Sequence, residues 1–173
     1  MKTLHILFVA LFASLFVLTS WTAAEYYSPT QDNPGDILIG NWQPSDKRSV
    51  IRISKGDASK GQDENKYYGR IVWLIEKNNP DGTPRLDINN PDASKHSNKI
   101  LGMTNMRDLE FTGTANDLTW GNGNIYDPKN GSDYSFEMTM DKKNTNLVDG
   151  RGYIGVSMFG RTDTWKRLTK KGE

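Results

Sequence analysis

Apolar and polar residues alternate in short runs along much of the chain. From Tyr134 to Met140 every second residue is apolar, and the residues between are polar or acidic, which is typical of a strand with one buried and one solvated face. Between Tyr67 and Ile75 both faces are largely apolar, so this segment is expected to be covered on both sides. No segment sustains the 3.6-residue period of an amphipathic helix. The pattern predicts an all-β protein.

Eight segments of this kind are separated by Gly, Asn, Asp and Pro. They are residues 36–42, 49–54, 67–75, 103–111, 124–127, 134–140, 146–158 (with a turn at Asp149-Gly150) and 162–168. The Asn-Gly and Asp-Gly pairs at 81–82, 122–123, 130–131 and 149–150 accept the positive φ of tight hairpin turns. Consecutive strands are therefore expected to pair as an antiparallel meander. With one apolar face, a meander of this length folds as a barrel or as a sandwich.

Residues at the two ends of this meander favour the barrel. Gly40 and Trp42 fall in the first strand, and Trp165 and Arg167 fall in the last. In a closed meander these strands are neighbours, so the Arg167 guanidinium is expected on the Trp42 indole, a contact worth about 0.5–2 kcal/mol. A first-strand Gly-x-Trp with a last-strand arginine resembles the calycin superfamily, which includes the lipocalins. We therefore expect a single antiparallel up-and-down barrel of about eight strands over residues 36–168.

The N-terminus has the layout of a secretory signal peptide. Lys2 precedes the mostly apolar run Leu4–Leu18, and small residues end at Ala24. The run is shorter than the roughly 20 residues that span a bilayer. We expect residues 1–24 to be removed, leaving an exported protein, periplasmic or secreted, with no membrane span. A polar leader, 25–35, would precede the barrel, and 169–173 would form a C-terminal tail.

Composition narrows the partners. The mature chain of 173 − 24 = 149 residues would keep 21 basic residues (22 less Lys2) and 21 acidic residues, which gives no electrostatic reason to expect nucleic acid. The chain has no cysteine, which excludes disulfides and thiolate metal sites. His96 is the single histidine of the mature chain, whereas zinc takes three or four nitrogen or sulfur ligands. We expect no metal and no cofactor, and the oligomeric state stays open.

The stretch Trp120–Met140 gathers acidic, amide and glycine residues and raises the question of a metal loop. Counted from Asp127, an EF-hand loop would place a lysine, a glycine and a methionine where oxygen ligands belong, so that pattern fails. A hairpin turn fits better, because Asn130-Gly131 accepts a left-handed conformation and Asp127 can cap its own loop. A contact of Asp127 or Asn130 with a ligand at the rim of the barrel is the alternative.

Carboxylates leave one route to catalysis. Asp87 and Asn90 lie in "LDINNPD", where a turn is expected and Asp87 would bond the local backbone. A hydrolase of the paired-carboxylate kind needs such groups to converge, and the candidates are Asp87, Asp127, Glu137 and Asp163. No Gly-x-Ser-x-Gly elbow, cysteine or histidine pair is present. The sequence therefore favours a protein that is not an enzyme.

Several motifs are similar, in order and spacing, to the bacterial domain of unknown function 2147 family. They are "IGNW", "YYGRIVWL", "LDINNPD", "ILGMTNM", "GNIYDPKNGSDY" and "RGYIGVSMFGRTDTWKR", which together run from about Ile37 to Arg167. The segment "KHSNK" at 95–99 departs from the arginine-containing stretch expected there. The resemblance implies a small exported bacterial barrel of the calycin kind, and it brings no established activity.

A barrel of about eight strands can hold one small ligand among apolar and aromatic side chains with a few polar anchors. The predicted ligand contacts are Tyr68, Arg70, Trp73, Phe136, Met138, Tyr153, Met158 and Arg161. An arginine near the opening would bind a carboxylate or phosphate, so a small hydrophobic or amphipathic ligand is the expected partner. The alternatives are a filled core, and an envelope or surface protein that binds other proteins through its loops.

Overall fold

The computed structural model describes residues 33–168; the predicted signal peptide, the leader up to Asp32 and the tail lie outside the described residues. The strands are β1 (Gly40–Gln43), β2 (Ser49–Lys55), β3 (Tyr67–Leu74), β4 (Thr104–Phe111), β5 (Leu118–Asp127), β6 (Ser132–Met140), β7 (Leu147–Tyr153) and β8 (Arg161–Leu168). Short 3-10 turns are η1 (Pro34–Leu38), η2 (Ala58–Lys60), η3 (Ala93–Lys95) and η4 (Ser157–Phe159). Within residues 33–168 no helix has the length and apolar character to cross a membrane.

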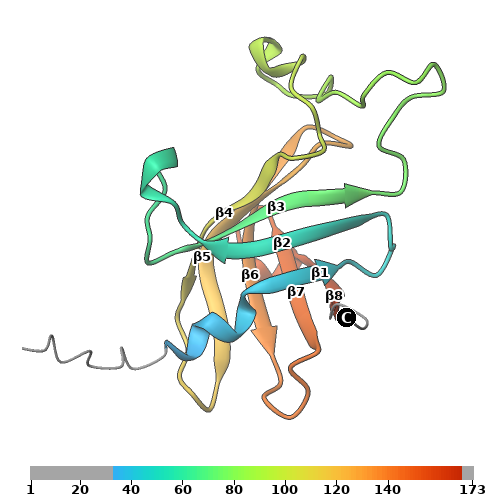
Figure 1. Ribbon diagram of the computed structural model, residues 1–173. Helices are drawn as coiled ribbons and strands as arrows, with labels where there is room; N and C mark the ends of the chain where they lie inside the picture. Colours follow the sequence, from blue (N-terminus) through green and yellow to red (C-terminus); the bar gives the residue numbers. More distant parts are fainter. Residues whose placement is uncertain (1–32, 169–173) are drawn as a thin grey trace, which may run out of the picture. The chain divides into compact units, whose positions relative to one another are not determined.

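Each strand pairs antiparallel with the next, and β8 pairs with β1, so the sheet closes on itself (Figure 1). The register at this seam places Trp42 opposite Arg167. The prediction of an all-β up-and-down barrel of eight strands is confirmed. Closure leaves none of these strands with a free edge, which removes the usual route to edge-to-edge aggregation.

Two of the predicted turns are parts of strands. Asn122-Gly123 lies inside β5, where β5 carries one residue more than β6 between Trp120 and Gly123. Asn122 takes a φ of 59°, so the pair forms a β-bulge, which uses the same left-handed preference as a hairpin turn. Asp149-Gly150 lies inside β7. Gly150 allows the Phe136 ring to pack closely against the β7 backbone, because a Cβ on residue 150 would come within 2.7 Å of that ring.

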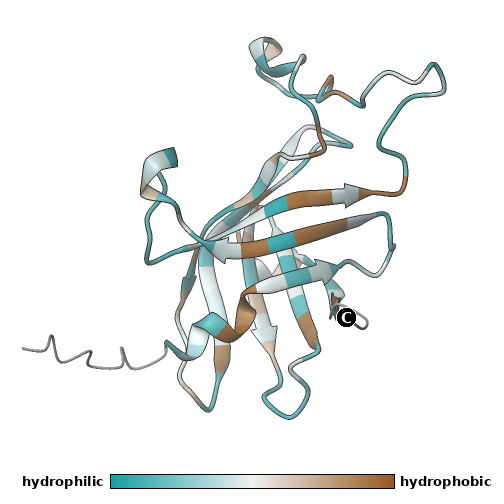
Figure 2. Cartoon of the chain, viewed as in Figure 1, coloured by the Kyte–Doolittle hydropathy of each residue, from teal (hydrophilic) through white to brown (hydrophobic). Residues whose placement is uncertain are grey.

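A bulge in β3 decides which of its side chains face inward. Ile71 pairs with Ile51 and Trp73 pairs with Val50, so β3 holds one extra residue between two consecutive positions of β2. Past this point the alternation shifts by one residue. Leu74 then lines the interior, whereas Trp73 is 45% exposed. Figure 2 shows long apolar stretches in β2 and β3.

One end of the barrel is filled by η1 and by the seam. Leu38 of η1 is fully buried, and its carbonyl accepts a 2.8 Å hydrogen bond from the Trp42 indole N–H. The Arg167 guanidinium lies 4.2 Å from the centroid of the buried Trp42 ring and donates to the carbonyls of Thr145, Ile39 and Ile37. Burial lowers the pKa of Arg167 from its ordinary value.

Gly40 makes this approach possible. Its φ is 149°, and a Cβ there would lie 2.8 Å from an Arg167 terminal nitrogen. A side chain at this position would therefore displace the guanidinium from the seam and strain the backbone. The predicted contact between first and last strands is present, and it ties three segments of the chain to one cation.

Replacing Arg167 with alanine is expected to lower the free energy of unfolding by about 2–4 kcal/mol, because it removes a cation–π contact and leaves backbone carbonyls without their donor. Urea unfolding followed by tryptophan fluorescence measures the change. Lys166→Ala is the matched control, since Lys166 is the exposed neighbour on the same strand. Equal losses in the two variants would contradict a special role for the seam.

Candidate ligand-binding site at the open end of the barrel

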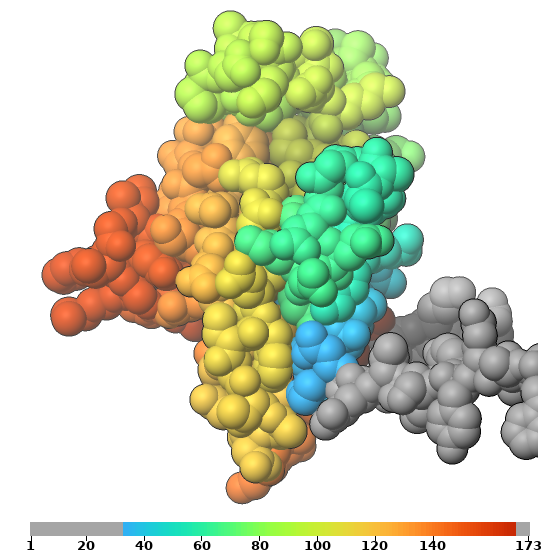
Figure 3. Space-filling model, turned by 90° about the vertical axis from the view of Figure 1, so that its left-hand side faces the viewer, coloured from blue at the N-terminus to red at the C-terminus, as the bar shows by residue number. Residues whose placement is uncertain are grey.

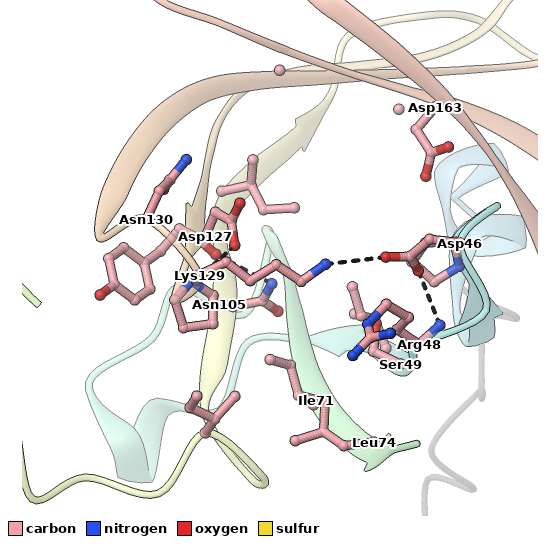
Figure 4. A pocket seen from close by; sticks show the side chains of 18 of the residues that line it. Asp46, Arg48, Ser49, Ile71, Leu74, Asn105, Asp127, Lys129, Asn130 and Asp163 are labelled. Atoms are coloured by element: carbon pink, nitrogen blue, oxygen red, sulfur yellow. Dashed lines mark hydrogen bonds and ion pairs between the residues drawn. The ribbon is translucent and has the colours of Figure 1, made fainter. Parts of the chain in front are cut away.

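The end of the barrel opposite η1 contains a cavity of about 530 Å³ (Figure 4). Four connections leave the strands at this end, namely 44–48, 75–103, 128–131 and 154–160. The first three contribute residues to the cavity wall. The segment 75–103 is the largest of them and forms the top of the molecule in Figures 1 and 3. We call this region the mouth.

The floor of the mouth is apolar. It is formed by Ile51, Ile71, Ile125, Phe136 and Trp165, which come from five different strands. The Phe136 and Trp165 rings lie 5.8 Å apart with 33° between their planes, within the range of favourable aromatic pairs. An apolar floor with a few polar groups above it is the common composition of small-molecule sites.

The rim of the mouth is charged but balanced. Its basic residues are Arg48, Arg85, Lys129 and Arg161, and its acidic residues are Asp46, Glu76, Asp127 and Asp163. Glu76 accepts from Arg48 at 3.1 Å and from Arg85 at 2.6 Å. Asp163 accepts from the Ser45 backbone N–H and hydroxyl. Arg161 makes no side-chain hydrogen bond or ion pair with any residue of 33–168.

An ion pair crosses the mouth. The Lys129 ammonium of the β5–β6 hairpin lies 3.2 Å from a carboxylate oxygen of Asp46 in the β1–β2 loop, as Figure 4 shows. Burial alone would raise the pKa of Asp46, but a hydrogen bond from the Arg48 backbone N–H and the Lys129 charge together bring this pKa below its ordinary value. The contact joins two loops that are distant in sequence and narrows the entrance.

The hairpin after β5 is a capped turn. The Asp127 carboxylate accepts from the Lys129 backbone N–H at 2.9 Å, and the Asp127 carbonyl accepts from the Gly131 N–H at 2.9 Å. Gly131 takes a φ of 73°, whereas Asn130 bonds the Ser132 N–H and the Tyr134 hydroxyl. The loop therefore has one left-handed residue, not two. Asp127 and Asn130 also line the mouth, so the turn and the rim position coexist.

Asp87 fastens the long connection to the barrel wall. Its carboxylate, 1% exposed, accepts hydrogen bonds of 2.7 Å from the Tyr126 hydroxyl and from the Asn90 side chain. The expected bond to the local backbone was wrong as to partner, since the carboxylate accepts from two side chains, Asn90 within its own turn and Tyr126 of β5. Burial, followed by the bond to Asp87, raises the pKa of Tyr126 to about 12. Asn89 adds bonds to the carbonyls of the β5–β6 hairpin.

Asn105 is a buried amide in the cavity wall. Its side chain is labelled in Figure 4 among the lining residues, and the residue is 5% exposed. It sits at an irregularity of β4, between the pairs Gly69–Met106 and Arg70–Thr104. Its Nδ2 donates to the Tyr126 carbonyl over a long 3.5 Å, and its Oδ1 has no protein partner within residues 33–168. Sequence patterns give no sign of it, because the irregularity that turns Asn105 inward depends on the pairing with β3.

The structure separates the predicted ligand contacts into two groups. Phe136 and Arg161 line the mouth. The other six do not, and they are Tyr68, Arg70, Trp73, Met138, Tyr153 and Met158. Trp73 is turned outward by the β3 bulge. Met158 is 81% exposed and lies on the β7–β8 loop. This loop projects at the left of Figure 3.

The remaining four have equally simple reasons. Tyr68 and Arg70 lie on the outer face of β3, where both line a separate groove. Tyr153 pairs with Ser135, so its side chain points outward like that of Ser135, whereas Phe136 points inward. Met138 faces inward but is 1% exposed in the core, deeper than the cavity floor.

The candidate carboxylates do not form one group. Asp127 and Asp163 line the mouth, Asp87 is buried behind Tyr126, and Glu137 lies on the outward face of β6, where it accepts from Ser157. Within residues 33–168 no three side chains of His, Cys, Asp or Glu lie close enough together to hold a metal ion. The paired-carboxylate hydrolase thus keeps only Asp127 and Asp163 as a pair on one cavity.

A closed eight-stranded barrel, filled at one end and open to a cavity at the other, defines a small calycin-like protein. The chain belongs to the family described as "Uncharacterized protein conserved in bacteria (DUF2147)", whose model matches residues 40–167. Among solved structures it is similar to protein HP1028 from Helicobacter pylori, which is described as belonging to the lipocalin family. That likeness has a TM-score of 0.60 and 19% identity, and it covers 77% of this chain and 84% of the other. No curated protein matches the chain.

Tyr126→Phe tests the anchor of the long connection. We expect a loss of about 1–3 kcal/mol in unfolding free energy near neutral pH, because the buried Asp87 carboxylate loses a donor. The raised pKa of Tyr126 also predicts the direction in which the unfolding free energy changes with pH. Between its ordinary value of 10.0 and about 12 the unfolded tyrosine is ionised and the folded one keeps its proton. Stability from this group is therefore complete below pH 10 and falls as pH rises toward 12.

Chemical unfolding at a series of alkaline pH values measures this dependence. The decline should be shallower in Tyr126→Phe than in the parent protein. Tyr153→Phe is the control, since the Tyr153 hydroxyl has no hydrogen-bond partner within residues 33–168. Identical pH profiles for the parent and Tyr126→Phe would show that the bond to Asp87 does not hold the phenol neutral.

Asn105→Leu is expected to raise the unfolding free energy by about 1 kcal/mol, because it replaces a poorly bonded buried amide with an apolar side chain of similar size. Thermal and urea unfolding measure the change. Asn124→Leu is a control on the neighbouring strand, where the asparagine is half-buried and faces outward. A destabilised Asn105→Leu would mean that the amide contributes to folding stability despite its unpaired oxygen.

Proposed function

We propose that the protein binds a small amphipathic molecule in the mouth of its barrel. The observation that carries this proposal is the composition of the cavity, which combines about 530 Å³ of space, an apolar floor and a polar rim. Because the loops of the rim are already bonded to one another, ligand binding would cost little conformational entropy in ordering them. The family membership and the fold add no activity of their own, since a fold does not imply a function.

The chemistry of the wall suggests the orientation of the ligand. Its apolar part would lie against Phe136 and Trp165, where burial of apolar surface contributes roughly 25 cal/mol per Å². An anionic group would lie near Arg161, because the other cations of the rim have carboxylate partners. Export is part of the proposal, with the ligand met outside the cytoplasm.

The alternative of an envelope or surface protein that binds other proteins stays a prediction. One feature favours it: Met158 and Phe159 at the tip of the β7–β8 loop are each 81% exposed. Arg151 holds this loop in shape through bonds to Ser157 and to the Met158 carbonyl. The mouth gives the more specific proposal, since it combines shape with polar groups that have a defined role.

Gly152→Leu provides the direct test. Gly152 lines the mouth, and a Cβ on it would meet Tyr134 at 3.6 Å and Ile125 at 3.9 Å, which are ordinary contacts. The added side chain should fill the cavity without unfolding the barrel. We expect at least about tenfold weaker binding of anilinonaphthalene sulfonate, a fluorescent amphipathic anion, because one leucine side chain occupies apolar area worth about 1.5–3 kcal/mol.

Gly121→Leu is the matched control, because Gly121 lies on β5 outside the cavity and a Cβ there meets only Thr112 at 3.7 Å. Fluorescence titration gives the affinities, and native mass spectrometry of protein purified from its own host identifies any bound compound. Binding of the probe with equal affinity by Gly152→Leu and Gly121→Leu would exclude the mouth as the site.

A further inference from the structure

A second concave site lies on the outer wall of the barrel, away from the mouth. It is a groove of about 420 Å³ over β2 and β3, bordered by the β2–β3 loop on one side and by the chain before β4 on the other. Its polar residues are Arg52, Ser54, Lys60, Gln62, Tyr68, Arg70 and Thr104. Three of them are basic and none is acidic, so the groove differs from the balanced mouth.

Two arginines face each other across the strands in this groove. Arg52 of β2 pairs directly with Arg70 of β3, and both side chains point outward. Figure 2 shows hydrophilic stretches side by side in the middle of these two apolar strands. Like charges directly opposite each other destabilise a sheet. Neither guanidinium has a carboxylate partner within residues 33–168, so the repulsion is not relieved by those residues.

Both guanidinium groups are nevertheless held in place. The Arg70 Nε donates to the Gly102 carbonyl at 2.8 Å, and the Arg52 Nε donates to the Asn41 side chain at 3.0 Å. Each bond uses the inner nitrogen, and neither arginine donates from a terminal nitrogen to any residue of 33–168. Bidentate recognition of an oxyanion requires such fixed and available donors.

The surrounding side chains add donors and no competing charge. The register places Asn41, Arg52, Arg70 and Thr104 in one row across four strands. The hydroxyls of Ser54 and Thr104 lie in the groove wall and can donate to an anion. Lys60 is the one cation of the groove with an acidic partner, Asp57. The groove volume of about 420 Å³ corresponds to roughly fourteen water molecules at about 30 Å³ each. This volume is larger than a single tetrahedral ion needs.

We propose that this groove binds a phosphate group, with Arg52 and Arg70 as its bidentate donors, and that the space around them receives the molecule that carries the phosphate. The anion neutralises two like charges that the sheet otherwise holds opposite each other. This site is independent of ligand binding in the mouth. The phosphate can come from a small soluble molecule or from a lipid headgroup, since both present the same oxygens.

Isothermal titration with inorganic phosphate, against sodium chloride of matched ionic strength, tests the donors. We expect saturable binding by the full mature chain and about tenfold weaker binding for Arg52→Gln and for Arg70→Gln measured separately, because each loses a charge-assisted pair of bonds. Arg107→Gln is the control, since Arg107 is a half-buried arginine that lies outside the groove and pairs with Asp133. Circular dichroism of each variant establishes that it is folded.

Vesicles distinguish the two sources of phosphate. Co-sedimentation with phosphatidylglycerol vesicles but not with neutral phosphatidylcholine vesicles, lost in Arg52→Gln, supports a headgroup. Binding of inorganic phosphate without binding to either vesicle supports a soluble ester. The proposal is overturned if phosphate behaves like chloride and neither vesicle binds, or if both arginine variants bind as well as Arg107→Gln does.

Discussion

The pairing of β1 with β8 is the constraint on which the rest of this structure depends. It joins the first and last segments of the barrel, so every inward side chain of eight strands must share one interior. Arg167 fixes the seam because it packs on Trp42 and bonds carbonyls of two other segments. With η1 and Leu38 filling that end, the cavity of about 530 Å³ lies at the opposite end. The position of the cavity is thus a consequence of how the barrel is closed.

The two ends of the barrel are stabilised by different interactions. The filled end is held by buried apolar and aromatic groups around one cation, and this packing leaves no room for a ligand there. The mouth is held by bonds between loops, such as Lys129 with Asp46 and Asp87 with Tyr126. Exposed ion pairs add little stability on their own. Their effect here is to fix the loops of the rim, which lowers the entropy that binding would cost.

The fold was predictable from sequence because its main signals are local. Alternation in Tyr134–Met140 gives the correct inward face of β6, and the placement of Trp42 and Arg167 gives closure. The site was less predictable, because β-bulges depend on the partner strand. One extra residue after Ile71 turns Trp73 outward and Leu74 inward, which no count along β3 alone would reveal. The same kind of irregularity hides Asn105, and the bond of Asp87 to Tyr126 joins positions 39 residues apart.

The proposals for this chain rest mainly on polar groups that lack a hydrogen-bond or charge partner among residues 33–168. A barrel of this size needs neither a buried amide with an unpaired oxygen nor two arginines opposed across a sheet, and both reduce stability. Natural sequences break such local rules mainly where a site requires it. Asn105 lies inside the mouth and Arg52 with Arg70 lie outside it, so the two departures are separate in space. They differ also in chemistry, since one is an unpaired acceptor oxygen and the other is a pair of donor groups. The ligand proposed for the mouth and the phosphate proposed for the outer groove would therefore be bound separately.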